Sequence, residues 1–393
     1  SLEQCIEIAI ENNPNLQAIQ NVTKIYESRI GQARSNYLPQ INLSSGYNRR
    51  NSITSSPIDK ASNSYQGNIS LNQLIYDFGK TSTTIRIQKL GLDAGNAEVN
   101  NTVNDITYNV KKAYYNVLYT LKNREVCKDA VEQYEQQLKQ ATAFFEEGLK
   151  PKIDVTIADV NLSNAQFNYI KADNAVETAY ADLNAAMGIS EALTYGLSDA
   201  LEFLDFDFGL DAALEEAYNN RPDLKALISK EKAAAESVKL AKKDYFPKLQ
   251  ATTSYGLGGS EFPLDSGWSF GGEITLPIFN GLLTHHKIKE AKVNLESARL
   301  DTEILKLNIF KDVQKAYIAV AEAKKKIPVA EKTVEQAKEN FELATGRYEV
   351  GVGNPIEVKD AEVSYSNARL SYYQALYDYN VAKSNLEKLV GRK

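Results

Sequence analysis

Few residues in this chain have the type and spacing that enzymatic chemistry requires. Two histidines and two cysteines occur in 393 residues. His285 and His286 are adjacent, so on a helix their side chains point in different directions, which argues against a shared metal site. Cys5 and Cys127 both fall within helical patterns, where a cysteine serves as a small apolar residue. There is no phosphate-binding glycine loop and no Ser/His/Asp arrangement, so we expect no enzymatic activity, no cofactor and no metal.

The composition is that of a folded protein without a general basic surface. Apolar residues make up 43% and charged residues 24% of the chain, and the formal net charge is −6. We therefore expect no nucleic-acid partner. No run of 18 or more apolar residues occurs, so the sequence predicts no transmembrane helix.

The pattern that organises the chain is a helical seam near its C-terminus. After a Gly/Pro break at 351–355, residues on one face recur at alternating steps of three and four, with large and small side chains alternating. They are Val358, Ala361, Tyr365, Ala368, Tyr372, Ala375, Tyr379, Ala382, Leu386 and Leu389. A heptad seam of this kind buries against another helix, and its alanines allow the neighbouring helix to approach closely.

The same stretch occurs twice in the sequence. Residues 142–188 match residues 345–391, and the glycines at the two ends are kept. The earlier seam comprises Val155, Ala158, Leu162, Ala165, Tyr169, Ala172, Val176, Ala179, Leu183 and Ala186. The duplication predicts one intertwined structural unit built from two halves.

We predict the same order of elements in both structural repeats. The first repeat, 1–209, comprises a helix 2–38, a β-hairpin 41–76, a long helix 80–146, a return helix 152–188 and a connector 189–209. The second, 210–393, comprises a helix 222–246, a β-hairpin 249–278, a long helix 282–346 and a return helix 355–390. Each long helix has about 65 residues and spans roughly 100 Å. The fold class is therefore mixed α and β, mostly α, with long antiparallel coiled-coil helices.

Both hairpins alternate apolar and polar residues with a period of two. Ile41, Leu43 and Tyr47 share one face in the first hairpin, as do Trp268 and Phe270 in the second, and a turn is expected at 51–63. This alternation is typical of transmembrane β-barrel strands, with the aromatic residues at the membrane interface. Four strands cannot enclose a lumen, so several copies would have to contribute to one barrel. A small soluble sandwich capping the helices fits the same alternation.

The order of these features resembles the TolC family, the outer-membrane channels of bacterial efflux pumps and type I secretion systems. The resemblance rests on the "ENNP" helix, the "YLPQI" strand entry, the "DFGK" strand exit, the duplicated "RYEVGVGNPIEVKDAEVSYSNARL" segment and the terminal "LEKLVG". It implies a homotrimer with one shared transmembrane β-barrel in the outer-membrane lipid and an α-helical tunnel across the periplasm. It also implies two partners, a periplasmic adaptor (membrane fusion) protein and an inner-membrane pump of the RND or ABC type.

The resemblance also assigns a constriction at the periplasmic mouth of the tunnel. Family members narrow this mouth with acidic residues after the second glycine turn, and the matching positions are Glu357 and Asp360. Three-fold symmetry would turn each carboxylate into a ring that favours cations. Asp154 matches Glu357 in the first repeat, whereas Ile157 stands where Asp360 would be, and Lys359 between the two acids weakens cation selectivity. The acids are equally explained as solvated residues in the first turn of a helix, where the helix dipole favours them.

The two glycine turns resemble the tips that family members present to the adaptor. Their residues are Gly148, Leu149 and Lys150 in the first repeat and Val350, Gly351, Val352 and Gly353 in the second. The glycines permit a tight reversal, and the apolar residues at an exposed tip suit a partner's surface. A plain helical hairpin would need the same glycines.

Two functional hypotheses follow. The first is a passive exit duct of a tripartite efflux pump or a type I secretion system, opened by untwisting of helices 282–346 and 355–390 at the turn end. The second is a soluble coiled-coil scaffold or tether with β caps. Within the exit-duct hypothesis, an efflux channel for metal ions is a less favoured alternative. The single methionine and the adjacent, divergent histidines argue against it.

Overall fold

The computed structural model describes residues 1–51, 61–191, 195–203, 205 and 208–392, so parts of the predicted turn at 51–63 and of the connector lie outside the described residues. The helices are α1 (Leu2–Asn12), α2 (Pro14–Ser35), α3 (Lys80–Glu146), α4 (Lys152–Ala186), α5 (Leu210–Asn220), α6 (Pro222–Lys242), α7 (Leu283–Glu349) and α8 (Pro355–Val390). The strands are β1 (Gln40–Arg50), β2 (Ser62–Tyr76), β3 (Lys248–Gly259) and β4 (Asp265–Thr275).

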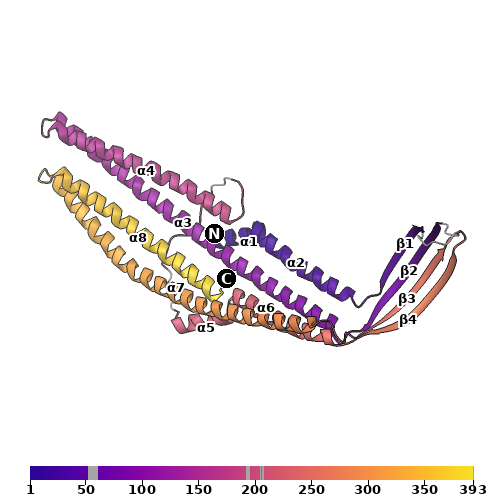
Figure 1. The fold of residues 1–393 in the computed structure, drawn as a ribbon. Helices are drawn as coiled ribbons and strands as arrows, with labels where there is room; N and C mark the ends of the chain where they lie inside the picture. Colours follow the sequence, from indigo (N-terminus) through magenta and orange to yellow (C-terminus); the bar gives the residue numbers. More distant parts are fainter. Residues whose placement is uncertain (52–60, 192–194, 204, 206–207, 393) are drawn as a thin grey trace. The chain divides into compact units, whose positions relative to one another are not determined.

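The internal duplication is confirmed, because the order helix, helix, strand, strand, helix, helix occurs twice (Figure 1). The long helices α3 and α7 extend close to their predicted ends, and Pro328 lies inside α7 without interrupting it. The predicted helix 222–246 ends earlier, at Lys242, and a single 3₁₀ turn, Lys243–Tyr245, leads into β3. Within the described residues, no helix combines the length and the apolar character of a membrane span.

The chain divides into two compact units that cut across the sequence repeats. The first unit comprises residues 1–18, 99–222 and 305–393, and the second comprises residues 19–98 and 223–304. Each unit therefore contains segments of both repeats. The first unit holds both chain termini, the turns α3–α4 and α7–α8, and the whole of α4 and α8; the second holds the sheet and nearly all of α6.

In the first unit, the predicted seams of α4 and α8 form the core. No residue of either seam is exposed, and most of the seam alanines are buried. Tyr379 and Leu386 of α8, Leu183 of α4 and Tyr114 of α3 are at most 1% exposed. The alternation of large and small residues therefore packs helix against helix along the seam.

Each return helix ends on the break between two shorter helices. Gly188 follows α4 with φ of +75°, and a Cβ there would lie 3.1 Å from the carbonyl oxygen of Asn12. Gly391 follows α8 with φ of +82°, and a Cβ there would lie 3.0 Å from the carbonyl carbon of Asn220. The end of α4 thus contacts the backbone at the α1–α2 break, and the end of α8 contacts the α5–α6 break. Only glycine fits both the left-handed conformation and the close approach.

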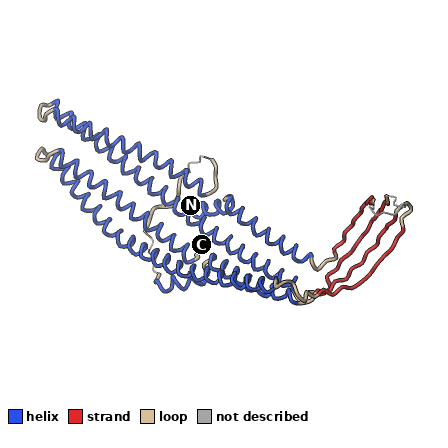
Figure 2. Tube along the Cα trace, viewed as in Figure 1, coloured by secondary structure: helices blue, strands red, loops and turns tan. Residues whose placement is uncertain are grey.

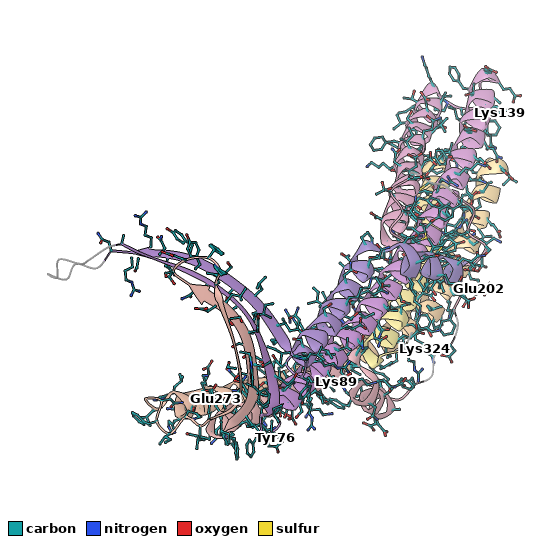
Figure 3. The ribbon with its side chains drawn as sticks, turned by 90° about the vertical axis from the view of Figure 1, so that its right-hand side faces the viewer. Tyr76, Lys89, Lys139, Glu202, Glu273 and Lys324 are labelled. Atoms are coloured by element: carbon teal, nitrogen blue, oxygen red, sulfur yellow. The ribbon has the colours of Figure 1, made fainter. Side chains whose placement is uncertain are left out.

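The second unit carries a single four-stranded antiparallel sheet in the order β1-β2-β3-β4 (Figure 2). The sheet is strongly curved along its strands (Figure 3). Its apolar face is not covered by any of the described residues: Trp268, Phe270 and Ile274 are 80%, 75% and 72% exposed. The outer edges of β1 and β4 have no partner strand among the described residues.

Side chains also fix the junction between the sheet and its helices in the second unit. The Asp77 carboxylate accepts hydrogen bonds from the N–H groups of Gly79 and Thr81 at 3.0 and 2.7 Å, so it caps the N-terminus of α3. Lys243, between α6 and β3, donates to the Gly79 carbonyl at 2.7 Å and to the Thr83 hydroxyl at 2.6 Å. The strand exit of one repeat is thereby tied to the strand entry of the other.

The substitution Gly391→Ala should lower the thermal unfolding midpoint, because it combines a positive φ with a backbone clash and costs on the order of 1–3 kcal/mol. Gly346→Ala is the matched control, since Gly346 lies inside α7 and a Cβ added there would have nothing within 4 Å. The control should leave the midpoint unchanged or raise it slightly. Circular dichroism at 222 nm measures both, and equal midpoints would contradict the close packing at the α5–α6 break.

Candidate functional site

The two glycine turns lie at the ends of the α3–α4 and α7–α8 hairpins in the first unit. Gly148 and Gly351 have φ of +75° and +79°, so the aligned glycines adopt the same left-handed conformation. Leu149, Val350 and Val352 are 64%, 75% and 74% exposed, as expected for residues at a tip. The structure thus places the predicted tip residues at tight turns with exposed apolar side chains.

A small apolar cluster holds the two hairpins together beneath the turns. It consists of the buried residues Ala344, Tyr348, Val358 and Ala361, with Phe144 and Phe341 packed against them. The rings of Phe144 and Tyr348 meet edge to face, with centroids 6.3 Å apart, and the Lys150 ammonium lies 5.8 Å from the centre of the Tyr348 ring. The two turns are therefore coupled through Tyr348.

The three predicted acidic residues lie in the first two turns of the return helices. Glu357 is exposed, and its Oε2 lies 3.9 Å from Nε of Arg347, while Asp360 is exposed on the next turn of α8. Asp154, in the first turn of α4, is half-buried. Burial, and secondarily the charge of Asp154, raises the pKa of Tyr348. Over the described residues, no group of three or more His, Cys, Asp or Glu side chains is placed to hold a metal ion.

Charged and polar links between α3 and α8 were not predicted from the sequence. Arg369 and Asp129 form an ion pair at 2.6 Å, and Lys111 and Glu387 form another at 2.8 Å. Arg369, Lys111 and Glu387 have side chains that are only 15–19% exposed. The sequence gives no signal for these pairs, because their members are more than 200 positions apart.

Glu362 of α8 makes a further polar contact with α3, through a hydroxyl group and not through a charged side chain. It is 4% exposed, and its carboxylate accepts hydrogen bonds from Tyr134 of α3 at 2.6 Å and from Ser366 at 2.7 Å. Burial, together with the bond to Glu362, raises the pKa of Tyr134 well above its usual range. The only sequence signal for this residue is its position next to the seam alanine Ala361.

Comparison with known proteins identifies the family. The family model described as "Outer membrane efflux protein" matches residues 5–189 and 213–392. The outer membrane protein TolC of Escherichia coli is 24% identical over an alignment that covers all of this chain and 82% of that protein. The outer membrane efflux protein BepC of Brucella suis is 22% identical, covering 98% of this chain and 84% of BepC.

Solved structures of similar channels have the same fold. The Campylobacter jejuni CmeC outer membrane channel superimposes with a TM-score of 0.86 at 20% identity, covering 99% of this chain and 85% of CmeC. The open state of the Neisseria gonorrhoeae MtrE outer membrane channel gives a TM-score of 0.83 at 23% identity, covering 100% of this chain and 89% of MtrE.

The chain belongs to the outer membrane efflux protein family. It is an outer-membrane exit duct for efflux or export, with its helical part in the periplasm, and it is a channel and not an enzyme. Family membership decides against the alternative of a soluble scaffold.

The substitution Asp129→Asn should destabilise the protein, because it leaves the largely buried guanidinium of Arg369 without its charged partner. The expected cost is about 1–3 kcal/mol. Glu125→Gln is the matched control: it breaks the pair of Lys122 with Glu125, whose side chains are 41% and 49% exposed, and such a surface pair contributes about 0–1 kcal/mol. Thermal unfolding of the two variants should differ clearly, and equal midpoints would show that the α3–α8 pair contributes no more than a surface pair.

Proposed function

We propose that the duct is a homotrimer in which three copies of the sheet close into one transmembrane barrel. The free edges of β1 and β4 support this, because an unpaired sheet edge must be covered or paired to be stable. The exposed apolar face that carries Trp268 and Phe270 would then face lipid. A closed ring of identical subunits joins the β4 edge of each copy to the β1 edge of the next.

The duplication supports a specific register for this join. Tyr47 pairs with Tyr65 in the first hairpin, and Tyr255 pairs with Trp268 in the second. The two hairpins therefore superimpose, with β1 equivalent to β3 and β2 equivalent to β4. The observed β2–β3 pairing then serves as a template for the pairing of β4 with β1 of the next copy.

Applying the β2–β3 register to β4 and to β1 of the next copy predicts which residues pair across the join. Leu71 of β2 pairs with Thr253 of β3, and their equivalents are Ile274 of β4 and Ser45 of β1. In the trimer, Ile274 of one copy should therefore lie opposite Ser45 of the next. The apolar faces of both strands then lie on the same side of the barrel, as the alternation requires.

Exposed residues after β4 support the same join. In the first repeat, the ring of Phe78 stacks on Phe246 at 5.3 Å and contacts Tyr76 at 4.8 Å, and Phe78 is 40% exposed. In the second repeat, Ile278 and Phe279 at the equivalent exit are 92% and 80% exposed. The strand entry of the next copy would contact them, as Phe246 contacts Phe78.

A cysteine pair tests the register. In a background of Cys5→Ala and Cys127→Ala, the combination of Ile274→Cys with Ser45→Cys should give disulfide-linked trimers on mild oxidation, because directly opposed Cβ atoms are about 5 Å apart. The control combines Ile274→Cys with Leu43→Cys, two residues out of register, and should link poorly.

The outcomes separate the two parts of this proposal. Preferential linking of the control pair would reject the register and leave the trimer. A single-chain mass by light scattering in detergent, with neither pair linked, would reject the trimer.

The turn end fits contact with the pump. The exposed apolar residues Leu149, Val350 and Val352, beside the cation Lys150, form a surface suited to a periplasmic adaptor protein. We assign the adaptor and an inner-membrane pump of the RND or ABC type as partners, on the basis of membership of the outer membrane efflux protein family.

The acidic residues of α8 fit a cation-selective constriction at the same end. Glu357 and Asp360 are both exposed within the chain, so a three-fold arrangement could present each as a ring in the tunnel. Asp154 of α4 lies close to Tyr348 and adds charge near the same turns. Opening would require the α7–α8 hairpin to move away from the tunnel axis.

The double substitution Glu357→Ala with Asp360→Ala should raise conductance in planar lipid bilayers and reduce cation selectivity, because two carboxylate rings are removed. Glu339→Ala with Glu342→Ala removes the same charge from exposed positions of α7 and should change neither quantity. Unchanged conductance in the Glu357→Ala, Asp360→Ala variant would contradict the assignment of these acids to the constriction.

A further inference from the structure

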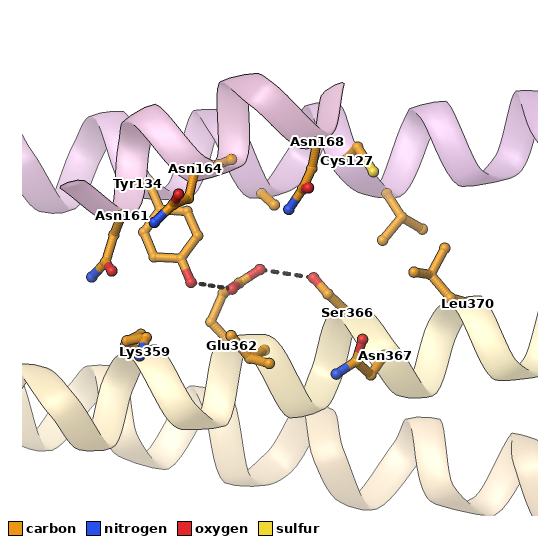
Figure 4. A pocket seen from close by; sticks show the side chains of 14 residues that line it. Cys127, Tyr134, Asn161, Asn164, Asn168, Lys359, Glu362, Ser366, Asn367 and Leu370 are labelled. Atoms are coloured by element: carbon orange, nitrogen blue, oxygen red, sulfur yellow. Dashed lines mark hydrogen bonds between the residues drawn. The ribbon is translucent and has the colours of Figure 1, made fainter. Parts of the chain in front are cut away.

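A cavity of about 220 Å³ lies between α3, α4 and α8 in the first unit (Figure 4). It has room for about seven water molecules. The constriction and tip residues do not line it. The family assignment does not explain it, and the inference below does not rest on the proposed trimer or on the pump partners.

The most unusual group at this cavity is the buried carboxylate of Glu362. Each of its two oxygens accepts one hydrogen bond, from the hydroxyl group of Tyr134 or of Ser366. Within the described residues, no Lys or Arg nitrogen lies within 4.0 Å of this carboxylate. The other acids that join α3 to α8 are different: Asp129 pairs with an arginine and Glu387 with a lysine. A buried negative charge without a counter-ion is costly, so a cation in the adjoining cavity would be strongly favoured.

The cavity wall suits an organic cation better than a bare metal ion. The side chain of Tyr134 lines it, as do the apolar side chains of Val126 and Leu370. An aromatic face attracts an ammonium group, and apolar walls bind a carbon skeleton. A metal ion would instead need several oxygen ligands close together, and Glu362 is the only carboxylate among the described residues of the lining.

The rim of the cavity is polar. Asn161, Asn164 and Asn168 follow one another on α4 at steps of three and four, so they lie on one face of that helix and line the cavity together. Their amides can donate or accept hydrogen bonds to polar groups of a ligand. Lys359 also lines the cavity and, within the described lining, is the one cation that could compete for Glu362.

We propose that this cavity is a binding site for a small organic ammonium ion, with the ammonium group against Glu362 and the ring of Tyr134, and the carbon skeleton against Val126 and Leu370. The bound ion would sit between the α3–α4 hairpin and α8. It would place a positive charge in contact with Glu362, which no Lys or Arg nitrogen among the described residues does.

The chain contains its own reporter for this site. Cys127 lines the cavity and is half-buried, whereas Cys5 is buried in α1. Burial, and secondarily the charge of Glu362, raises the pKa of the Cys127 thiol, so the thiol senses this carboxylate. The reactivity of Cys127 toward charged and neutral reagents can therefore measure the preference of the cavity for cations.

The test uses the whole protein in detergent with Cys5→Ala. Cys127 is modified with 2-aminoethyl methanethiosulfonate, which is cationic, and with its neutral 2-hydroxyethyl analogue, and the ratio of the two rates is recorded. Because both reagents attack the same thiolate, the ratio cancels any change in the pKa of Cys127. Glu362→Gln keeps the shape and an acceptor for Tyr134, and it should lower the ratio about fivefold by removing one nearby charge.

Two further variants make the result specific. Glu132→Gln removes a carboxylate from an exposed position of α3 that does not line the cavity, and it should leave the ratio unchanged. Lys359→Met removes the competing cation and should raise the ratio. An unchanged ratio in both Glu362→Gln and Lys359→Met would overturn the proposal.

Protection then identifies the ligand class. With the neutral reagent, 2-phenylethylammonium should slow modification of Cys127 in a saturable way, whereas 2-phenylethanol at the same concentration should not. Glu362→Gln should abolish this protection. Protection by calcium ions without protection by the amine would replace the organic ammonium site with a metal site, and equal protection by amine and alcohol would show that Glu362 has no role in binding.

Discussion

Direct backbone contact at the two helix breaks is the constraint on which the first unit depends. Gly188 and Gly391 end the return helices against the breaks at Asn12 and Asn220, with no side chain between the two backbones. Because the contact involves backbone on both sides, it fixes the position at which each return helix ends against the neighbouring pair of short helices in the same chain. The seams of α4 and α8 can then pack in only one axial position, and the glycine turns follow from that position.

The small residues of the seams have a second effect. Alanines at Ala368 and Ala375 bring α8 close to its neighbours, but they contribute little buried area each. Polar links between α3 and α8 compensate, and they also define which residues face each other. The pairs Arg369–Asp129 and Lys111–Glu387 have this role. Long helices with a repetitive apolar seam could otherwise slide by one heptad.

The fold was largely predictable from the sequence because its signals are local. Heptad spacing and the Gly/Pro breaks predicted α4 and α8 close to their observed ends, and the alternation of residues such as Ile41 and Leu43 predicted the strands. The positions of Gly148 and Gly351 at turns followed from the duplication.

The unpredicted features depend on contacts between distant positions. Glu362 appears in the sequence only as a charge beside a seam residue, and nothing there shows that Tyr134, 228 positions away, lies opposite it. The ion pair between Arg369 and Asp129 joins residues 240 positions apart. For the proposed constriction the limit is different, because in the proposed trimer the environment of Glu357 and Asp360 would depend on the other copies of the chain, which the sequence of one copy does not describe.

The two free edges of the sheet have a genetic consequence. In the proposed ring, every chain supplies a β1 edge to one neighbour and a β4 edge to the other, so no chain can be incorporated without taking part in two joins. A chain with a damaged edge would therefore interrupt every ring that contains it. When intact and damaged chains are made together in one cell, the share of intact rings falls as the cube of the share of intact chains, so such alleles would act dominantly over the normal one.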